Sequence, residues 1–301
     1  MHQIWKNKWE KIGLILKPNH EIYWMKSHTS SPFVVNDKGK LSFFFTARDS
    51  QNRSRIGQGN LSINGSTVIV ESISKDPIIE LGESGSFDES GTSYPCIVDE
   101  YLFYTGWKIK DEIPFENNLG VAKRNIKLFE KLSNKPIIKK DKFNQFGVGS
   151  VFILKEEKFH MWYTSFINWD TTKLPKHFYN IKYACSKDGI NWEIDNLTSI
   201  DFSYDNEFAI CRPSIIKFNN RYHMVFCHRG DKYSLGYAYS EDKLNWVRDD
   251  KALKLNKSVT GFDSEEMSYP FWFIYDESIY LFYCGNNYGN SGIGVARLKL
   301  N

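Results

Sequence analysis

The sequence repeats one pattern of apolar segments about every 60 residues. Its most visible sign is a phrase that begins Phe-Asp and ends Tyr-Pro, found at residues 87–95 and again at residues 262–270. Five aromatic segments give the full register, each ending in Thr or Cys at position 46, 105, 164, 227 or 284. A fixed period of this length indicates a repeat architecture in which every copy is one supersecondary unit.

Each copy contains the same succession of short apolar segments. One segment, usually opened by proline, precedes the aromatic one and begins at residue 32, 95, 150, 213 or 270. Because proline is tolerated at the first residue of a strand, we expect these prolines to open the first strands. Another segment follows the aromatic one, at residues 56–59, 119–122, 181–184, 235–238 and 293–296. A turn and a fourth segment come next, clearest after Asp188-Gly189, a dipeptide typical of hairpin turns. Four short strands in each of five copies predict an all-β, five-bladed β-propeller with four antiparallel strands per blade.

The two ends of the chain fit a closed ring. The last copy stops after its third segment, while residues 9–16 resemble the fourth segments that begin at Trp192 and Trp246. We therefore expect the N-terminal strand to complete the last blade, in a single domain over residues 1–301. A linear array of five separate sheets is the structural alternative, and it would leave open sheet edges.

Composition excludes several classes of partner. Lys and Arg number 39 against 36 Asp and Glu, and a net charge of +3 is too small for an electrostatic footprint on nucleic acid or anionic lipid. The N-terminus has no apolar signal region, and no apolar stretch is long enough to predict membrane insertion, so we expect a cytoplasmic protein. The five scattered cysteines predict buried free thiols. No ligand spacing predicts a metal site or a cofactor, and the oligomeric state stays open.

Unusual polar residues gather at one mouth of the predicted propeller. In an antiparallel blade, the start of the first strand, the end of the second and the start of the third lie at the same end. Glycosyl transfer needs a carboxylic acid and a carboxylate, and the candidates are Asp88, Glu207, Asp263 and Glu265. Side chains that could hold a sugar or its anionic groups are His28, Arg48, Asp49, Glu89, Trp107, His177, Arg212, Arg229 and Asn286. The sequence therefore predicts a carbohydrate or activated sugar as the partner.

Each of these residues also has a purely structural interpretation. Asp88 and Asp263 could cap turns through bonds to backbone groups. Arg48 could pair with Asp49, and Arg212 could point into a blade interface instead of the channel. A loop histidine is often only a local hydrogen-bond partner.

Several phrases resemble a known group. Residues 186–192 (Ser-Lys-Asp-Gly-Ile-Asn-Trp), residues 102–106 (Leu-Phe-Tyr-Thr-Gly) and Arg48-Asp49 at the end of an aromatic segment resemble the five-bladed β-propeller glycosidase superfamily, which includes glycoside hydrolase families 32, 43, 62, 68, 117 and 130. The resemblance covers essentially the whole chain. Residues 47–54, 207–213 and 262–265 resemble an uncharacterised branch associated with bacterial surface-polysaccharide gene clusters. The resemblance implies activity on a glycoside or activated sugar in the cytoplasm.

The sequence departs from this group at an informative position. Families 32 and 43 supply an aspartate from the innermost strand of the first blade, whereas residues 28–32 read His-Thr-Ser-Ser-Pro. The catalytic assignments of those families therefore cannot be carried over directly. Among the carboxylates at the mouth we predict Glu207 and Glu265 as the acid and the base or nucleophile, with Asp88 and Asp263 as supporting carboxylates. One alternative is a phosphorylase that binds phosphate through Arg48, Arg212 and Arg229, as family 130 does with basic residues. The other is a sugar-binding or assembly module without turnover.

Overall fold

The protein is almost entirely β-structure in the computed structural model, which describes residues 5–111, 113–126, 128–138, 140–172 and 175–300. Within these ranges the only helical segments are the short 3-10 helix η1 (Asp250–Leu253) and the single-turn α1 (Asn286–Gly289). The all-β prediction is confirmed. The strands form an eight-stranded, a nine-stranded and a four-stranded sheet.

The eight-stranded sheet consists of two antiparallel four-stranded units. The first contains β2 (Ser27–Asp37), β3 (Lys40–Arg48), β4 (Ser54–Asn64) and β5 (Thr67–Ile73). The second contains β6 (Gly91–Val98), β7 (Tyr101–Lys108), β8 (Glu116–Arg124) and β9 (Phe129–Lys131). One parallel pairing, between Ser54 and Gly91, joins the two units.

The nine-stranded sheet divides in the same way. Its first unit contains β10 (Val148–Lys155), β11 (Phe159–Asp170) and β12 (Lys176–Ser186), and both β13 (Trp192–Glu193) and β14 (Thr198–Ile200) pair with β12. Its second unit contains β15 (Ala209–Phe218), β16 (Arg221–Arg229), β17 (Tyr233–Ser240) and β18 (Val247–Arg248). A single parallel pairing, Tyr179 with Ala209, joins them.

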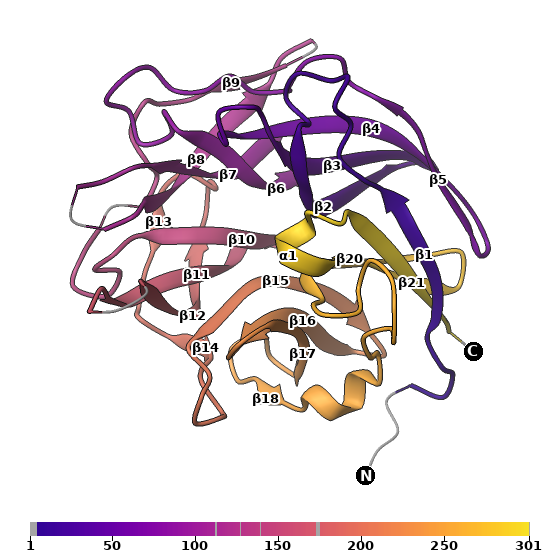
Figure 1. Ribbon diagram of the computed structural model, residues 1–301. Coiled ribbons are helices and arrows are strands. Elements are labelled where there is room, and N and C mark those ends of the chain that lie inside the picture. Colours follow the sequence, from indigo (N-terminus) through magenta and orange to yellow (C-terminus); the bar gives the residue numbers. More distant parts are fainter. Residues whose placement is uncertain (1–4, 112, 127, 139, 173–174, 301) are drawn as a thin grey trace.

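The four-stranded sheet unites the two ends of the chain. Strands β19 (Ser268–Tyr275), β20 (Ser278–Cys284) and β21 (Ile293–Lys299) come from the C-terminus, and β1 (Glu10–Leu16) pairs antiparallel with β21. The predicted position of the N-terminal strand in the last sheet is confirmed. Figure 1 shows β1, in indigo, beside yellow β21.

The first strand of each unit lies nearest the centre of the molecule. Figure 1 shows β2, β6, β10 and β15 close to a common centre, with β5, β9, β13 and β18 toward the periphery. Consecutive first strands contact one another: β2 with β6, β6 with β10, β10 with β15, β15 with β19, and β19 with β2. Residues at the same height of these strands therefore surround one central space.

The prolines that were expected to open the first strands lie inside them instead. Ser31, Tyr94, Arg212 and Tyr269 each precede one of these prolines, and all four have positive φ, between 47° and 56°. The strand register shifts at the same place, as in a β-bulge, where proline is tolerated. Residues other than glycine adopt this backbone region at a cost of about 1–3 kcal/mol each. The bulges turn the side chains of the residues before proline toward the central space.

Aromatic residues of the second strands fill the core between the sheets. Phe43, Phe44, Phe103, Trp162 and Phe282 are among the fully buried rings. All five cysteines are buried and free, which confirms the prediction of buried thiols. Across the described residues, no helix is both long and apolar enough to cross a membrane.

Candidate functional site

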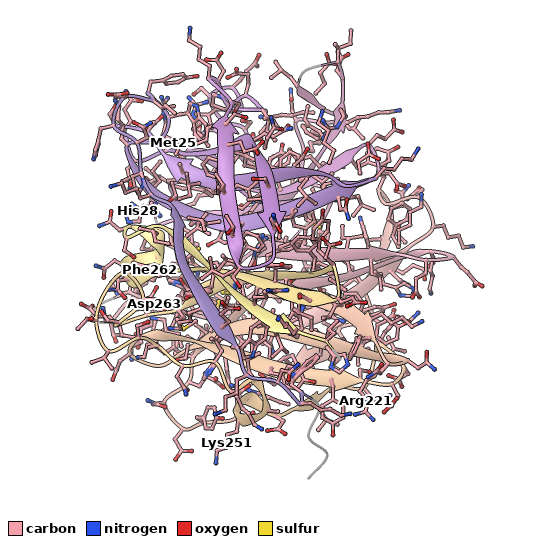
Figure 2. All side chains as sticks on the ribbon, turned by 90° about the vertical axis from the view of Figure 1, so that its right-hand side faces the viewer. Met25, His28, Arg221, Lys251, Phe262 and Asp263 are labelled. Atoms are coloured by element: carbon pink, nitrogen blue, oxygen red, sulfur yellow. The ribbon has the colours of Figure 1, made fainter. Side chains whose placement is uncertain are left out.

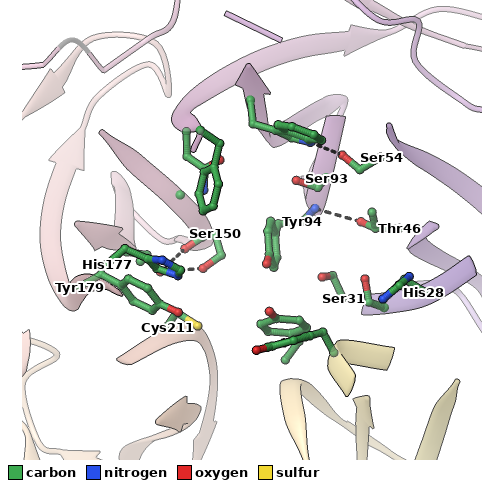
Figure 3. A pocket seen from close by; sticks show the side chains of 18 of the residues that line it. His28, Ser31, Thr46, Ser54, Ser93, Tyr94, Ser150, His177, Tyr179 and Cys211 are labelled. Carbon is green, nitrogen blue, oxygen red and sulfur yellow. Dashed lines mark hydrogen bonds between the residues drawn. The ribbon is translucent and has the colours of Figure 1, made fainter. Parts of the chain in front are cut away.

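A pocket of about 480 Å³ opens at the central space, where the first strands carry their bulges. Hydroxyl groups line much of it, from Ser30, Ser31, Thr46, Ser54, Ser93, Ser150 and Thr164. Figure 3 shows His28, Ser31 and Thr46 on one side of the pocket, His177, Tyr179 and Cys211 on the other, and Tyr94 between them. Because every first strand except β19 supplies a serine or a cysteine, the wall offers many uncharged hydrogen-bond donors and acceptors.

Five tyrosines form a second group of lining residues: Tyr94, Tyr179, Tyr233, Tyr269 and Tyr288. The hydroxyls of Tyr179 and Tyr233 are hydrogen bonded to each other. The ring of Tyr94 meets that of Tyr269 edge-on, with centroids 5.4 Å apart. Burial raises the pKa of Tyr94 and Tyr269, so these phenols stay protonated at neutral pH and can donate hydrogen bonds.

Aromatic side walls flank the tyrosines. The Trp107 indole nitrogen donates to Ser54 Oγ at 2.6 Å, which fixes the ring at the pocket edge. On the other side, His177 stacks on Tyr179 with centroids 5.1 Å apart, and Phe115 contacts His177 edge-on. Flat apolar faces beside hydroxyl groups are suited to a sugar ring, whose own faces are apolar and whose rim is polar.

Two arginines carry the charge of the pocket. Arg48 donates to the side-chain oxygen of Asn52 at 2.8 Å. The Arg229 guanidinium lies over the rings of Phe208, Tyr233 and Tyr288, between 5.2 and 5.6 Å from their centroids. Neither arginine forms an ion pair with a carboxylate that the structure describes.

Both histidines of the pocket are neutral at physiological pH. Burial, and then the charge of Arg229, lowers the pKa of His177 to about 4. Burial, and then Arg48, also lowers the pKa of His28, whose Nδ1 is bonded to Ser27 Oγ. No described residue that lines the pocket is Asp or Glu. The arginines therefore give the pocket a positive potential that no lining carboxylate offsets.

The structure brings five of the predicted site residues together in this pocket: His28, Arg48, Trp107, His177 and Arg229. The other eight do not line it: Asp49, Asp88, Glu89, Glu207, Arg212, Asp263, Glu265 and Asn286. The four carboxylates that were predicted to perform catalysis are all in this second group.

Asp88 and Asp263 occupy equivalent positions in the two copies of the Phe-Asp phrase. Asp88 Oδ2 accepts a hydrogen bond from Tyr104 on β7 at 2.8 Å and lies 2.6 Å from Lys131 Nζ on β9. Asp263 repeats the arrangement with Tyr283 on β20, at 2.9 Å, and Lys11 on β1. Both carboxylates are 1% exposed, and Figure 2 marks Phe262 and Asp263. Each aspartate thus joins its loop to the second and fourth strands of one unit.

Glu207 makes the corresponding contacts in the unit of β15 to β18. His228 on β16 lies 2.7 Å from Glu207 Oε1, and Arg248 on β18 donates to both carboxylate oxygens at 2.7 and 2.8 Å. Burial alone would raise the pKa of Glu207, but the bonds from His228 and Arg248 outweigh it and lower the pKa to about 2. A carboxylate held in this way stays ionised and is a poor general acid.

The remaining predicted residues have local partners. The Glu265 side chain is 58% exposed and lies 3.4 Å from Lys232 Nζ. Asp49 accepts bonds from the backbone of its own turn and from Arg53. Glu89 accepts from the backbone of Gly85, and Asn286 accepts from the backbone nitrogens at 265 and 266.

Arg212 is buried across the central axis. Its side chain donates to the carbonyl oxygens of Ser31, Pro32 and Pro95, at 2.9 to 3.4 Å, and so links β15 to β2 and β6. It is 2% exposed and pairs with no described carboxylate. Burial lowers its pKa. Its observed contacts are therefore structural.

The predicted site residues include neither the tyrosines nor Glu266. Tyr94 and Tyr269 stand in the repeated Tyr-Pro phrase, and their position before proline in a first strand is the signal that could have identified them. Glu266 is 2% exposed, and its Oε1 accepts a hydrogen bond from the backbone nitrogen of Tyr288 at 2.9 Å. It fixes the segment from which the Tyr288 ring reaches the pocket.

Two sequence relatives match this chain over nearly its full length, and a third matches part of it. No protein-family model matches the sequence. The uncharacterized proteins Rv1502 and MT1551, from two strains of Mycobacterium tuberculosis, are each 33% identical to the chain over 302 aligned positions, which cover 97% of this chain and 99% of the relative. A beta-1,2-mannobiose phosphorylase from a Thermoanaerobacter species is 30% identical over 131 residues, or 38% of this chain and 43% of that protein.

Solved structures with the same fold include glycoside hydrolases of the propeller superfamily. A glycoside hydrolase superimposes with a TM-score of 0.74 and 18% identity, covering 97% of this chain and 92% of its own. A thermostable family-43 glycoside hydrolase gives 0.68 with 14% identity, covering 94% and 92%. A structure from work on the family 130 mannoside phosphorylases and glycoside hydrolases gives 0.69 with 17% identity, covering 97% and 93%. The resemblance to the propeller glycosidases is thereby confirmed at the level of fold.

Proposed function

The chain belongs to the same family as the uncharacterized protein Rv1502 of Mycobacterium tuberculosis, and we propose that it binds a sugar with an anionic substituent in its central pocket. The scaffold of this proposal is a single five-bladed propeller over residues 1–301. Its support is the cycle of contacts between the five first strands and the pairing of β1 with β21. Ligand pockets favour such axial positions, where several elements converge.

One observation carries the proposal. Arg48 and Arg229 face a pocket in which no described lining residue is a carboxylate, so a bound phosphate or carboxylate would supply the missing negative charge. Guanidinium groups bind such anions through paired hydrogen bonds. Trp107 and Phe115 offer faces for the sugar ring, and the serine and threonine hydroxyls offer partners for its hydroxyl groups.

The pocket gives no support to hydrolysis by Glu207 and Glu265. Glycosidases of the two-carboxylate type place both groups beside the scissile bond. Glu207 is instead bound to Arg248 and His228, and Glu265 is largely exposed to solvent outside the pocket.

Binding is tested by calorimetric titration with glucose 1-phosphate, mannose 1-phosphate and glucuronic acid, with glucose and mannose as the neutral counterparts. We expect at least one anionic sugar to bind and its neutral parent to bind far more weakly. Arg229→Met and Arg48→Met should each lower the affinity by about tenfold or more, the usual effect of losing a charged hydrogen bond. Arg221→Met is the matched control, because Arg221 pairs with Glu241 outside the pocket. Equal binding of neutral sugars, or unchanged affinity in both pocket variants, would contradict the proposal.

Phosphorolysis is the second candidate, favoured by the partial match to a mannobiose phosphorylase. Phosphate held by the arginines would attack the anomeric carbon, so that the glycosidic C–O bond breaks, a bond to phosphate oxygen forms and the leaving oxygen takes the proton that the hydrogen phosphate loses. Incubation with β-1,2-mannobiose and inorganic phosphate should then release mannose 1-phosphate. Release of free mannose at the same rate with and without phosphate would reject this reaction.

A further inference from the structure

Two cysteine thiols lie in contact at the wall of the central pocket. Cys211 on β15 and Cys227 on β16 are directly opposite each other in the antiparallel pair, and their Sγ atoms are 3.4 Å apart. Cys211 is a lining residue of the pocket (Figure 3). Cys227 is fully buried and does not line it. The pair thus joins one thiol that a small solute in the pocket can meet with one that it cannot.

The positions of the two residues suit a disulfide. Opposite residues of antiparallel strands have Cα atoms about 4.5 or 5.5 Å apart, and both values lie within the range of about 4.4–6.8 Å found for disulfides. The sulfurs would have to approach by roughly 1.4 Å to reach bonding distance. Rotation of the two side chains can supply such a movement without a shift of the strands.

The other cysteines have no such partner. Cys284 Sγ accepts a bond from the backbone of Ser31, and Cys185 Sγ contacts Lys158 and Glu193. In the described part of the chain, Cys211 with Cys227 is the one thiol–thiol contact. Oxidation within the folded protein should therefore be selective for this pair.

We propose that Cys211 and Cys227 form a reversible disulfide under a peroxide oxidant. The Cys211 sulfur attacks one peroxide oxygen, the O–O bond breaks, and a sulfenic acid and one water are formed. The Cys227 sulfur then attacks the Cys211 sulfur, and the S–S bond forms as hydroxide leaves and takes the thiol proton. The two thiols lose two electrons and two protons, and the peroxide becomes two waters.

The surroundings assign the order of these steps. Burial, together with its bond to Cys211, raises the pKa of the Cys227 thiol, so Cys227 keeps its proton until the sulfenic acid stands beside it. Its Sγ already points at Cys211, since it also donates to the Cys211 carbonyl oxygen at 3.4 Å.

The same reaction would alter the ligand site. Cys211 Sγ lies 3.8 Å from the Tyr233 hydroxyl, which is bonded to the Tyr179 hydroxyl. A disulfide moves this sulfur toward Cys227 and replaces its thiol hydrogen, so the contact that helps to fix the two phenols changes. Resting on the proposed function, the inference is that oxidation weakens binding of the anionic sugar.

The covalent part is tested on the whole protein without any ligand. After treatment with hydrogen peroxide and alkylation under denaturing conditions, the number of free thiols should fall from five to three, and peptide mapping should recover a Cys211–Cys227 cross-link that dithiothreitol removes. Cys227→Ala should abolish the cross-link, whereas Cys185→Ser should retain it. If Cys227→Ala does not fold, the peptide map of the wild-type protein still shows whether the Cys211–Cys227 cross-link forms. Five free thiols after oxidation, or a cross-link between other cysteines, would overturn the proposal.

The regulatory part is tested separately by titration of glucose 1-phosphate, mannose 1-phosphate and glucuronic acid into the reduced and the oxidised wild-type protein. We expect affinity to fall several-fold on oxidation and to recover with dithiothreitol. Equal affinity in both states would refute the regulation and leave the disulfide standing. Absence of binding in both states would instead refute the proposed function.

Discussion

Lys11 Nζ on the N-terminal strand lies 2.5 Å from Asp263 Oδ2, in the loop before the last sheet. Lys131 and Asp88 repeat this relationship at 2.6 Å within the second unit of the first sheet. In both cases a phenylalanine before the aspartate stacks on the tyrosine that donates to it, with ring centroids 6.1 Å apart for Phe87–Tyr104 and 5.7 Å for Phe262–Tyr283. Lys11 therefore occupies the place of a fourth-strand lysine, and the Phe-Asp phrase is explained by structure.

The ion pair of Lys11 should contribute to stability. Lys11→Met leaves a carboxylate that is 1% exposed without its cation, and such losses cost about 3 kcal/mol. Urea unfolding should show this loss. Lys8→Met, which removes an exposed lysine from the same segment, should change the free energy of unfolding very little. The double variant Lys11→Met with Asp263→Asn should lose less than the sum of the two single variants. Strict additivity would mean that the two side chains do not interact.

Protonation of Glu207 should lower the free energy of unfolding in acid. Its pKa in the folded protein is about 2, below the ordinary value of about 4.3 for glutamate. Above the ordinary value both states are ionised and the stabilisation is complete, and it is lost as pH falls from about 4.3 toward 2. Wild-type unfolding free energy should therefore drop through this range, and part of the drop should disappear in Glu207→Gln. Glu265→Gln, which changes an exposed side chain, is the control. If both variants follow the wild-type curve, the bonds from Arg248 and His228 do not stabilise the fold.

Glu266 should position Tyr288. Asn287 and Tyr288 both have positive φ, and the bond from the Tyr288 backbone nitrogen to Glu266 Oε1 helps to hold this segment. Removing a buried charged acceptor costs about 2 kcal/mol, so Glu266→Ala should destabilise the protein by about that amount, measured by urea unfolding. Glu266→Gln keeps an acceptor oxygen and should lose less. Equal losses in the two variants would assign the effect to the charge instead of the hydrogen bond.

The sequence predicted the strands far better than the site. Strand order and the place of β1 follow from periodic apolar segments. Such periodicity can be recognised from residues that are close together in the sequence. The direction of a side chain after a bulge is different: Tyr269 points at the pocket because the strand register shifts at Pro270. Asp263 forms an ion pair with Lys11, which is remote in sequence. Neither the bulge nor such a distant partner is encoded in local spacing.

Histidine burial should give the protein a second, milder dependence on pH. The pKa of His177, in the pocket wall, and that of His223, bonded to Tyr237 in the core, are both lowered to about 4, chiefly by burial. The unfolded chain takes up these protons near pH 6.5, whereas the folded protein does not, so stability is lost as pH falls from about 6.5 toward 4. This range lies above that of Glu207, and the two contributions can be separated.

The free energy of unfolding of the wild type should be lower at pH 5 than at pH 7.5. The difference should shrink in His177→Phe, which keeps the aromatic contacts with Phe115 and Tyr179 but cannot be protonated. His20→Phe is the control, because His20 lies outside the pocket and the core. A His177→Phe profile that overlays the wild type between pH 7.5 and 5 would show that His177 titrates alike in the folded and unfolded states.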